Sequence, residues 1–188
     1  MPSLVMLAGP NGAGKTTIYE AYLADKNLPF INADQLAARF NLEPYPAARM
    51  AGEMRSALIE ERISFVTETV FSDPVGSKLG LLKRAVDSGY EVTLIFIGLS
   101  CVELSRLRVH SRVSAGGHFV PAEKLPGRYE RSLLNLKAAI SCVPRVLIYD
   151  NSSISDCFRL IADCRAGQVA PVLDRTQWPD WVRRAVNT

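Results

Sequence analysis

One stretch near the start of the chain has the residue types and spacing of a phosphate-binding loop. Residues 9–17 read Gly-Pro-Asn-Gly-Ala-Gly-Lys-Thr-Thr, which matches the Walker A pattern G-x-x-x-x-G-K-[ST]. Glycines let backbone N–H groups turn toward phosphate oxygens, and the lysine reaches the β- and γ-phosphates. The pattern predicts ATP or GTP binding by Gly9, Pro10, Asn11, Gly12, Ala13, Gly14, Lys15, Thr16 and Thr17. The Thr16 hydroxyl is the expected ligand of Mg²⁺.

Two acidic residues could direct a phosphoryl group to an acceptor. Asp34 follows the short apolar pair Phe30-Ile31, so we expect it at the carboxyl edge of a sheet, where α/β proteins bind ligands. There it would orient an acceptor hydroxyl and accept its proton, which makes it a predicted catalytic and substrate-binding residue. The alternative is that Asp34 caps the helix that starts at Gln35.

Glu68 interrupts an apolar strand, and a buried carboxylate is costly unless it is paired or near a metal ion. We assign Glu68 to acceptor binding or to the water shell of Mg²⁺, with an ion pair to an arginine as the alternative. The neighbouring Thr69 is assigned to the substrate as well. Asp150 ends another apolar run, and its position beside Asn151 favours a turn over a metal ligand.

Basic residues gather in one segment of the chain. Residues 100–145 contain 8 Lys/Arg and 3 Asp/Glu, whereas the rest contains 14 and 16. Arg108 and Arg112 share one helical face, and Arg128 and Arg131 share a second face with Asn135. Such faces are often only solvated. Here they flank Gly116-Gly117, which predicts an arginine-bearing lid over residues 108–131 that closes on the nucleotide and stabilises transition-state charge.

Within this predicted lid, Arg112 and Arg128 are assigned to catalysis, Arg108 to the nucleotide and Arg131 to the substrate. His118 follows the glycine pair. It could contact the substrate, or form a hydrogen bond that fixes the loop.

The elements that must position these residues alternate between strand and helix. Apolar runs at 3–8, 30–31, 63–71, 90–99, 145–149 and 169–173 predict strands. Helical spacing recurs after Lys15, at 46–62 (through Met50, Met54, Ala57 and Leu58), at 75–86 and at 154–165. This alternation predicts a three-layer P-loop fold, with a parallel sheet covered by helices on both faces. We expect one domain over residues 1–188, ending in a packing tail at about 174–188 that contains Trp178.

Composition excludes several classes of protein. The chain is 48% hydrophobic and 22% charged, as in soluble globular proteins, and no apolar run is long enough to cross a bilayer. The four cysteines form no CxxC pair, and the N-terminus lacks the pattern of a signal peptide. We therefore expect a cytoplasmic protein without a membrane partner. The net charge of +3 does not favour a nucleic-acid partner, because a basic lid explains it equally well.

Taken together, these segments resemble the zeta toxin family of P-loop kinases. The resemblance rests on the loop at 9–17, Asn32-Ala-Asp34, Phe65-Val-Thr-Glu68-Thr69, Arg112-Val-x-x-Gly116-Gly-His118-x-Val120-Pro121, Arg128-Tyr-x-Arg131-Ser-x-x-Asn135-Leu136 and Tyr149-Asp-Asn-Ser152. It covers about residues 3–170.

The resemblance implies a fold like that of the nucleoside monophosphate kinases. It also implies transfer of the γ-phosphoryl group from ATP or GTP to the 3′-hydroxyl of UDP-N-acetylglucosamine, and an antitoxin partner that blocks the nucleotide site. By the same resemblance, Asp34 matches the catalytic base, Glu68 a substrate-side acid, and Arg112 and Arg128 the arginines on the γ-phosphate.

Other functions remain open from the sequence. The chain could be a kinase for a nucleoside, a nucleotide or another metabolite with no link to toxicity, or a nucleotide sensor without catalysis. A transporter ATPase would need an LSGGQ-like signature and an apolar run ending in Asp-Glu, and the sequence contains neither.

Overall fold

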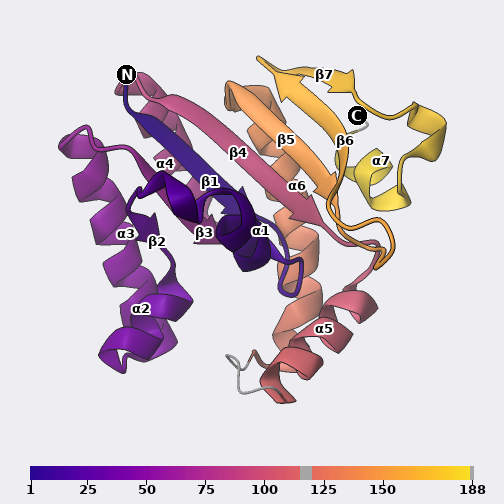
Figure 1. Ribbon diagram of the computed structural model, residues 1–188, viewed down its shortest axis with the longest axis horizontal. Helices are drawn as coiled ribbons and strands as arrows, with labels where there is room; N and C mark the ends of the chain where they lie inside the picture. Colours follow the sequence, from indigo (N-terminus) through magenta and orange to yellow (C-terminus); the bar gives the residue numbers. More distant parts are fainter. Residues whose placement is uncertain (115–119, 187–188) are drawn as a thin grey trace.

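The computed structural model describes residues 1–114 and 120–186, which form a layered α/β fold around one seven-stranded sheet (Figure 1). The strands are β1 (Ser3–Ala8), β2 (Phe30–Ile31), β3 (Phe65–Thr69), β4 (Glu91–Gly98), β5 (Arg145–Asp150), β6 (Arg159–Arg165) and β7 (Gln168–Pro171). Their order is β2-β3-β1-β4-β5-β6-β7, with β1 to β5 parallel and β6 and β7 antiparallel. The predicted fold class is confirmed, with an antiparallel extension at one edge.

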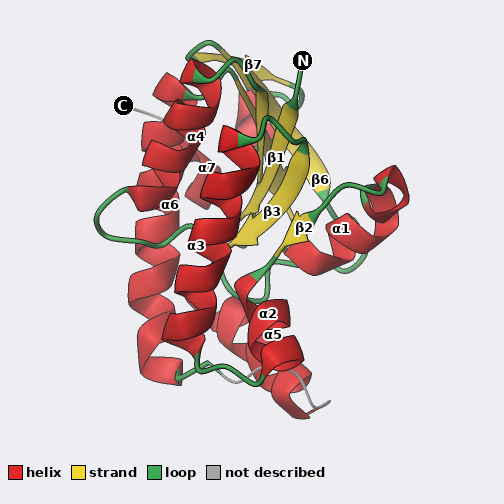
Figure 2. Cartoon of the chain, turned by 90° about the vertical axis from the view of Figure 1, so that its left-hand side faces the viewer, coloured by secondary structure: helices red, strands yellow, loops and turns green. Residues whose placement is uncertain are grey.

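Helices cover both faces of the sheet. They are α1 (Lys15–Tyr22), α2 (Ala33–Phe40), α3 (Pro44–Glu60), α4 (Ser77–Asp87), α5 (Val102–Ser114), α6 (Leu125–Cys142) and α7 (Asp180–Val186), with 3₁₀ turns at Ala24–Lys26, Ala122–Lys124 and Arg175–Gln177. In Figure 2, α3, α4 and α6 lie on one face and α1 on the other, whereas α2 and α5 lie beyond the carboxyl ends of the strands. None of the helices in the described ranges is both long and apolar enough to cross a membrane.

The centre of the sheet is mainly apolar because it is covered from both sides. Leu4, Met6 and Leu7 of β1 are completely buried, as are Leu94 and Phe96 of the neighbouring β4. This packing holds the carboxyl end of β1, and with it the start of the phosphate loop, in a fixed position.

The helix predicted at 154–165 is wrong, since residues 159–165 form strand β6. The chain reverses between β6 and β7 through Ala166 and Gly167, whose φ angles are 48° and 82°. Two consecutive positive φ values are typical of a type I′ hairpin turn, which joins adjacent antiparallel strands. Pairing along β5 and across this hairpin gives the segment the hydrogen bonds that a helix would otherwise supply.

The face that α3 buries also differs from the expected one. Met54 and Ala57 are exposed, whereas the buried positions are Ala47, Ala51, Arg55 and Ile59. These four recur at i, i+4, i+8 and i+12 and form one stripe along the helix. The stripe therefore includes an arginine that hydrophobic periodicity could not select.

The C-terminal tail forms the short packing helix that the sequence predicts. The Trp181 ring of α7 lies directly against Gly98, at the end of β4, and its Nε1 donates a 2.8 Å hydrogen bond to Asp150 Oδ1. Asp150 also accepts a 2.6 Å bond from the Ser152 hydroxyl, which agrees with the turn role that the sequence favours. Asp150 thus ties α7 to the end of β5.

Candidate nucleotide site

The phosphate loop lies between the end of β1 and the start of α1, as its sequence predicts. Gly9 has a φ of 138°, and a Cβ there would collide with the Ile97 carbonyl. A Cβ on Gly12 would lie 3.0 Å from Arg108 Cβ, and one on Gly14 would lie 2.8 Å from Asn151 Nδ2. The three glycines are therefore required by close contacts as well as by backbone conformation.

Side chains from distant elements fix the loop from outside. The Ser105 hydroxyl donates to the Asn11 carbonyl at 2.6 Å, and Asn151 Nδ2 donates to the Ala13 carbonyl at 2.9 Å. Arg108 Nη1 lies 3.5 Å from the Gly12 carbonyl. Because the C=O and N–H groups of a trans peptide point in opposite directions, the N–H groups of residues 12 and 14 face away from these donors. This is the orientation that a phosphate cradle needs.

Lys15 stands at the centre of the candidate site. It is only 6% exposed, and its ammonium donates to the Gly9 and Pro10 carbonyls at 3.0 and 3.1 Å. Burial lowers the pKa of Lys15, the charges of Glu68 and Asp34 act in the opposite direction, and Arg112 adds to the lowering. Three residues chosen from the sequence therefore lie within electrostatic reach of this one ammonium group.

Glu68 is the closest of these three in the described contacts. Its Oε2 accepts hydrogen bonds from the Thr16 hydroxyl (2.9 Å) and from Asn32 Nδ2 (3.0 Å), while Oε1 lies 4.0 Å from Lys15 Nζ. Pairing of Leu7 with Glu68 in adjacent strands brings the carboxylate to the loop. Lys15 is thus a cation that faces Glu68.

Asp34 is an exposed residue in the first turn of α2, beyond the end of β2. The alternative that it caps this helix is wrong, because Asn32 is the cap. The Asn32 Oδ1 accepts hydrogen bonds from the backbone N–H groups of Asp34 and Gln35 at 2.8 and 3.3 Å. Asn32 therefore fixes both the start of α2 and, through its Nδ2, the Glu68 carboxylate.

Arg131 and Thr69 both contact the loop that follows β3. Arg131 Nε donates to the Ser72 carbonyl at 2.8 Å, and Asn135 Nδ2 donates to the carbonyls of Phe71 and Asp73 at 2.8 and 3.1 Å. The Thr69 hydroxyl accepts a 3.2 Å bond from the Phe71 N–H. In this structure these side chains set the shape of the loop beside Glu68.

The other lid arginines lie on the two helices that flank the glycine pair. Arg108 and Arg112 are on α5, and the partly buried Arg128 is near the start of α6. His118 lies outside the described residues. Of the predicted lid, the structure therefore describes the two flanking helices, α5 and α6.

Several residues that build the site were missed by the sequence reasoning. Ser105 and Asn151 hold the loop carbonyls, and Asn151 is itself held by the Phe158 N–H at 3.3 Å. Asn151 lies in a segment of the family resemblance, but the contact that each residue makes spans more than ninety residues of chain, so the sequence does not indicate its role. Asn32 is recognisable from the sequence as a candidate helix cap, because asparagine is among the preferred N-cap residues.

The residues present suit a nucleotide with Mg²⁺. The cradle of glycines, the buried Lys15 and the hydroxyl of Thr16 provide the groups that such a ligand requires. Within residues 1–114 and 120–186, no cluster of three or more His, Cys, Asp or Glu could hold a metal ion by itself. A Mg²⁺ ion here would therefore depend on the nucleotide phosphates for most of its ligands.

Comparison with known proteins agrees with this fold. An uncharacterized protein of Haemophilus influenzae is 30% identical over 130 residues, which are 66% of this chain and 91% of that protein. A chain of the AvrRxo1-ORF1:AvrRxo1-ORF2 complex, crystallised with sulphate ions, has a TM-score of 0.72 at 14% identity. That match covers 99% of this chain but only 64% of the other, so this chain spans less than two thirds of its length.

A structure from the PezAT chromosomal toxin-antitoxin system of Streptococcus pneumoniae has a TM-score of 0.64 at 16% identity, covering 98% of this chain and 84% of that one. A parallel sheet with a strand–glycine loop–helix unit defines the P-loop fold. The model of the zeta toxin family matches residues 1–159 of the chain. The chain therefore belongs to this family.

Proposed function

We propose that the protein is a kinase that transfers the γ-phosphoryl group of ATP or GTP to a hydroxyl group of a small molecule. One observation carries the proposal: Lys15 Nζ, at the phosphate loop, lies 4.0 Å from Glu68 Oε1, and the charges of Asp34 and Arg112 also act on the pKa of Lys15. The site therefore combines a cation that can bind phosphate, two carboxylates and an arginine of the predicted lid. Phosphoryl transfer is catalysed mainly by positioning and by charge, and it needs this combination.

In this proposal, each group has a role that follows from its position. The backbone N–H groups of residues 11–16 and the Lys15 ammonium bind the phosphates. Asp34, exposed at the carboxyl edge of the sheet, orients the acceptor hydroxyl and accepts its proton. Arg112 and Arg128, on the helices at either end of the lid, come onto the γ-phosphate as the lid closes.

Mg²⁺ would be held by the Thr16 hydroxyl and would neutralise charge on the β- and γ-phosphates. Glu68 accepts the hydrogen bond of that same hydroxyl. This contact favours the metal side of the two roles considered for Glu68, in which the carboxylate receives hydrogen bonds from metal-bound water. The charge of Glu68 also opposes the lowering of the Lys15 pKa by burial.

UDP-N-acetylglucosamine is the first acceptor to test, because the family membership supports it. The AvrRxo1 complex has also been solved with ATP, and the PezAT structure belongs to a toxin-antitoxin system. These relatives support ATP as the donor and an antitoxin protein as a partner for this chain. A cytoplasmic location would give the enzyme access to both nucleotide substrates.

The test is a mass-spectrometric screen for phosphorylated products. The full chain is incubated with Mg²⁺-ATP and, separately, with UDP-N-acetylglucosamine, a set of nucleosides and a pooled bacterial metabolite extract. Lys15→Ala should abolish product formation, whereas Lys26→Ala, which removes an exposed lysine beyond α1, should not. Product from UDP-N-acetylglucosamine supports the toxin-like kinase, and product from another compound supports a metabolite kinase. Tight ATP binding without any product would overturn the kinase in favour of a nucleotide sensor.

A further inference from the structure

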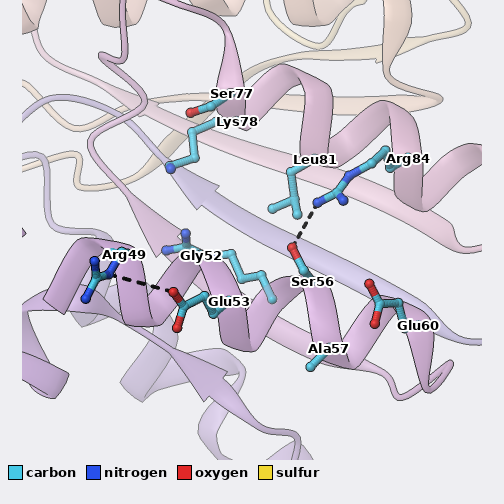
Figure 3. Close-up of a pocket in the computed structure, with 11 residues that line it drawn as sticks. Arg49, Gly52, Glu53, Ser56, Ala57, Glu60, Ser77, Lys78, Leu81 and Arg84 are labelled. Carbon is cyan, nitrogen blue, oxygen red and sulfur yellow. Dashed lines mark hydrogen bonds and ion pairs between the residues drawn. The ribbon is translucent and has the colours of Figure 1, made fainter. Parts of the chain in front are cut away.

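A groove of about 580 Å³ lies between α3 and α4, and none of the residues considered above for the nucleotide lines it (Figure 3). Its charged lining residues are the basic Arg49, Arg55, Lys78 and Arg84 and the acidic Glu53 and Glu60. Two of the basic side chains are already engaged. Arg49 pairs with Glu53 at 3.7 Å, and Arg84 Nη2 donates to the Ser56 hydroxyl at 3.0 Å. The other two basic residues of the groove are Arg55 and Lys78.

Arg55 is buried in an unusual way. It is 3% exposed and belongs to the stripe that α3 turns toward the sheet. Its Nε donates a 2.7 Å hydrogen bond to the Thr67 hydroxyl, which in turn donates to the Ile31 carbonyl at 2.8 Å. Among the described residues, no carboxylate lies within 4.0 Å of its guanidinium, and Nε makes its only described hydrogen bond. Its two terminal nitrogens are thus left to the groove that Arg55 lines.

Lys78 supplies a second cation to the same groove. Figure 3 shows its side chain reaching from the start of α4 into the space between the two helices. Burial lowers the pKa of Lys78, the charge of Arg55 lowers it further, and Asp73 opposes both. The Asp73 carboxylate lies at the N-terminus of α4, where its Oδ2 accepts from the Ser77 hydroxyl and the Lys78 N–H at 3.1 and 3.4 Å, while its Oδ1 is buried without a described hydrogen-bond partner.

Arg55 is almost fully buried and shares its groove with the half-buried Lys78. A buried charge without a counter-charge is costly, and a like charge nearby adds to that cost. An apolar side chain at position 55 would continue the stripe of Ala47, Ala51 and Ile59 at no such cost. An anion placed between the guanidinium and the ammonium would remove the penalty and gain charge-assisted hydrogen bonds.

We propose that the α3–α4 groove is a binding site for a phosphate-type oxyanion, held by the guanidinium of Arg55 and the ammonium of Lys78. Arginine offers planar paired donors, which suit phosphate oxygens, and lysine adds a point charge. The Thr67 hydroxyl fixes Nε, so it aims the rest of the guanidinium. The oxyanion belongs either to the acceptor of the kinase or to a separate phosphate compound.

Binding of inorganic phosphate tests the site directly, without any nucleotide. Titration calorimetry at constant ionic strength uses the Lys15→Ala protein, in which the phosphate loop has lost its cation. We expect one phosphate per chain in this background. Adding Lys78→Met or Arg55→Met should weaken it about tenfold or more, as expected for a lost charge-assisted hydrogen bond. Arg49→Gln is the matched control, because it removes an arginine at the exposed rim, 81% accessible, and should leave the affinity unchanged.

Each outcome decides the proposal. Absence of phosphate binding in the Lys15→Ala background, or equal affinity after both methionine substitutions, overturns it. If Arg55→Met does not fold, as judged by its thermal melt, Lys78→Met and Arg55→Lys decide, and the conservative variant should retain binding.

The source of the oxyanion is resolved by kinetics with the acceptor found in the product screen. If the acceptor carries the oxyanion, Lys78→Met raises its KM about tenfold with little change in kcat, because ground-state binding is lost. Unchanged kinetics with lost phosphate binding assigns the groove to a separate phosphate compound. If the screen yields no product at all, the kinase proposal fails while the phosphate titration still stands or falls by itself.

Discussion

The Thr16 hydroxyl donates a 2.9 Å hydrogen bond to Glu68 Oε2 and so links the first turn of α1 to the end of β3. Both residues lie at the carboxyl edge of the sheet, in adjacent strand–loop units. A hydroxyl that donates a hydrogen bond to a carboxylate keeps its oxygen lone pairs available for a metal ion. The contact therefore prepares Thr16 for the Mg²⁺ that the phosphate-loop pattern predicts.

From this relationship we predict the effect of Glu68→Gln. The amide can still accept the bond from Thr16, but the negative charge beside Lys15 is lost. We expect phosphoryl transfer to fall about 10²- to 10³-fold, in the range for one electrostatic group at a reaction centre, with a higher Mg²⁺ requirement. Glu20→Gln, on the exposed side of α1, is the control and should transfer normally. Unaltered Mg²⁺ dependence in Glu68→Gln would remove the carboxylate from the metal.

Asp34→Asn tests the acceptor side of the same site. The amide cannot accept the acceptor's proton, so we expect turnover to fall about 10²- to 10⁴-fold, the usual contribution of a general base. Nucleotide affinity should change little, because the phosphates are bound by the loop and Lys15. The measurements are transfer rate by mass spectrometry and nucleotide affinity by calorimetry, with the exposed Asp25→Asn as control. Near-normal transfer to the true acceptor would show that another group takes the proton.

The sequence was sufficient for those features that local chemistry determines. The spacing of Gly9 to Thr16 predicts the loop, and the apolar runs predict the strands that carry it. The sequence also places Glu68 at the site, because a carboxylate inside an apolar strand needs a counter-charge. Its partner proves to be Lys15 at 4.0 Å, and only the pairing of β1 with β3 determines that.

Features that depend on distant contacts could not be predicted. The segment at 154–165 has helical spacing, but hydrogen bonds to β5 and the hairpin at Gly167 make residues 159–165 a strand. Arg55 lies in a buried stripe because small residues at Ala47 and Ala51 bring that side of α3 to the sheet. The sequence of α3 shows more apolar residues on another side, so hydrophobic periodicity does not select the arginine.

Tyr129 gives a prediction about alkaline stability. Its buried hydroxyl donates to the Leu99 carbonyl at 2.8 Å, and burial, the largest cause, raises its pKa from 10.0 to about 12. A raised pKa means that the folded state keeps a proton that the unfolded state loses. The contribution to stability is therefore complete below pH 10.0 and is lost as the pH rises through about 12.

The measurement is urea unfolding of wild type and Tyr129→Phe across this pH window. At neutral pH the variant should be about 1–3 kcal/mol less stable, because the Leu99 carbonyl loses its donor. The difference should shrink as the pH rises between 10.0 and about 12. Tyr45→Phe, which changes a tyrosine that is 83% exposed, should follow wild type throughout. A pH-independent difference would mean that Tyr129 ionises normally.

Gly98→Ala tests how α7 is held on the sheet. Gly98 ends β4, and an added Cβ would collide with the Trp181 ring, whose Nε1 is bound to the buried Asp150. The ring cannot shift without losing that hydrogen bond, so we expect a loss of about 1–3 kcal/mol in the free energy of unfolding, as for an overpacked core.

Gly80→Ala is the matched control. A Cβ there meets nothing within 4 Å, and Gly80 lies inside helix α4. That variant should gain roughly 0.5–1 kcal/mol, because alanine restricts the unfolded chain and favours the helix. Equal stability of the two variants in urea unfolding would mean that Trp181 does not pack on Gly98.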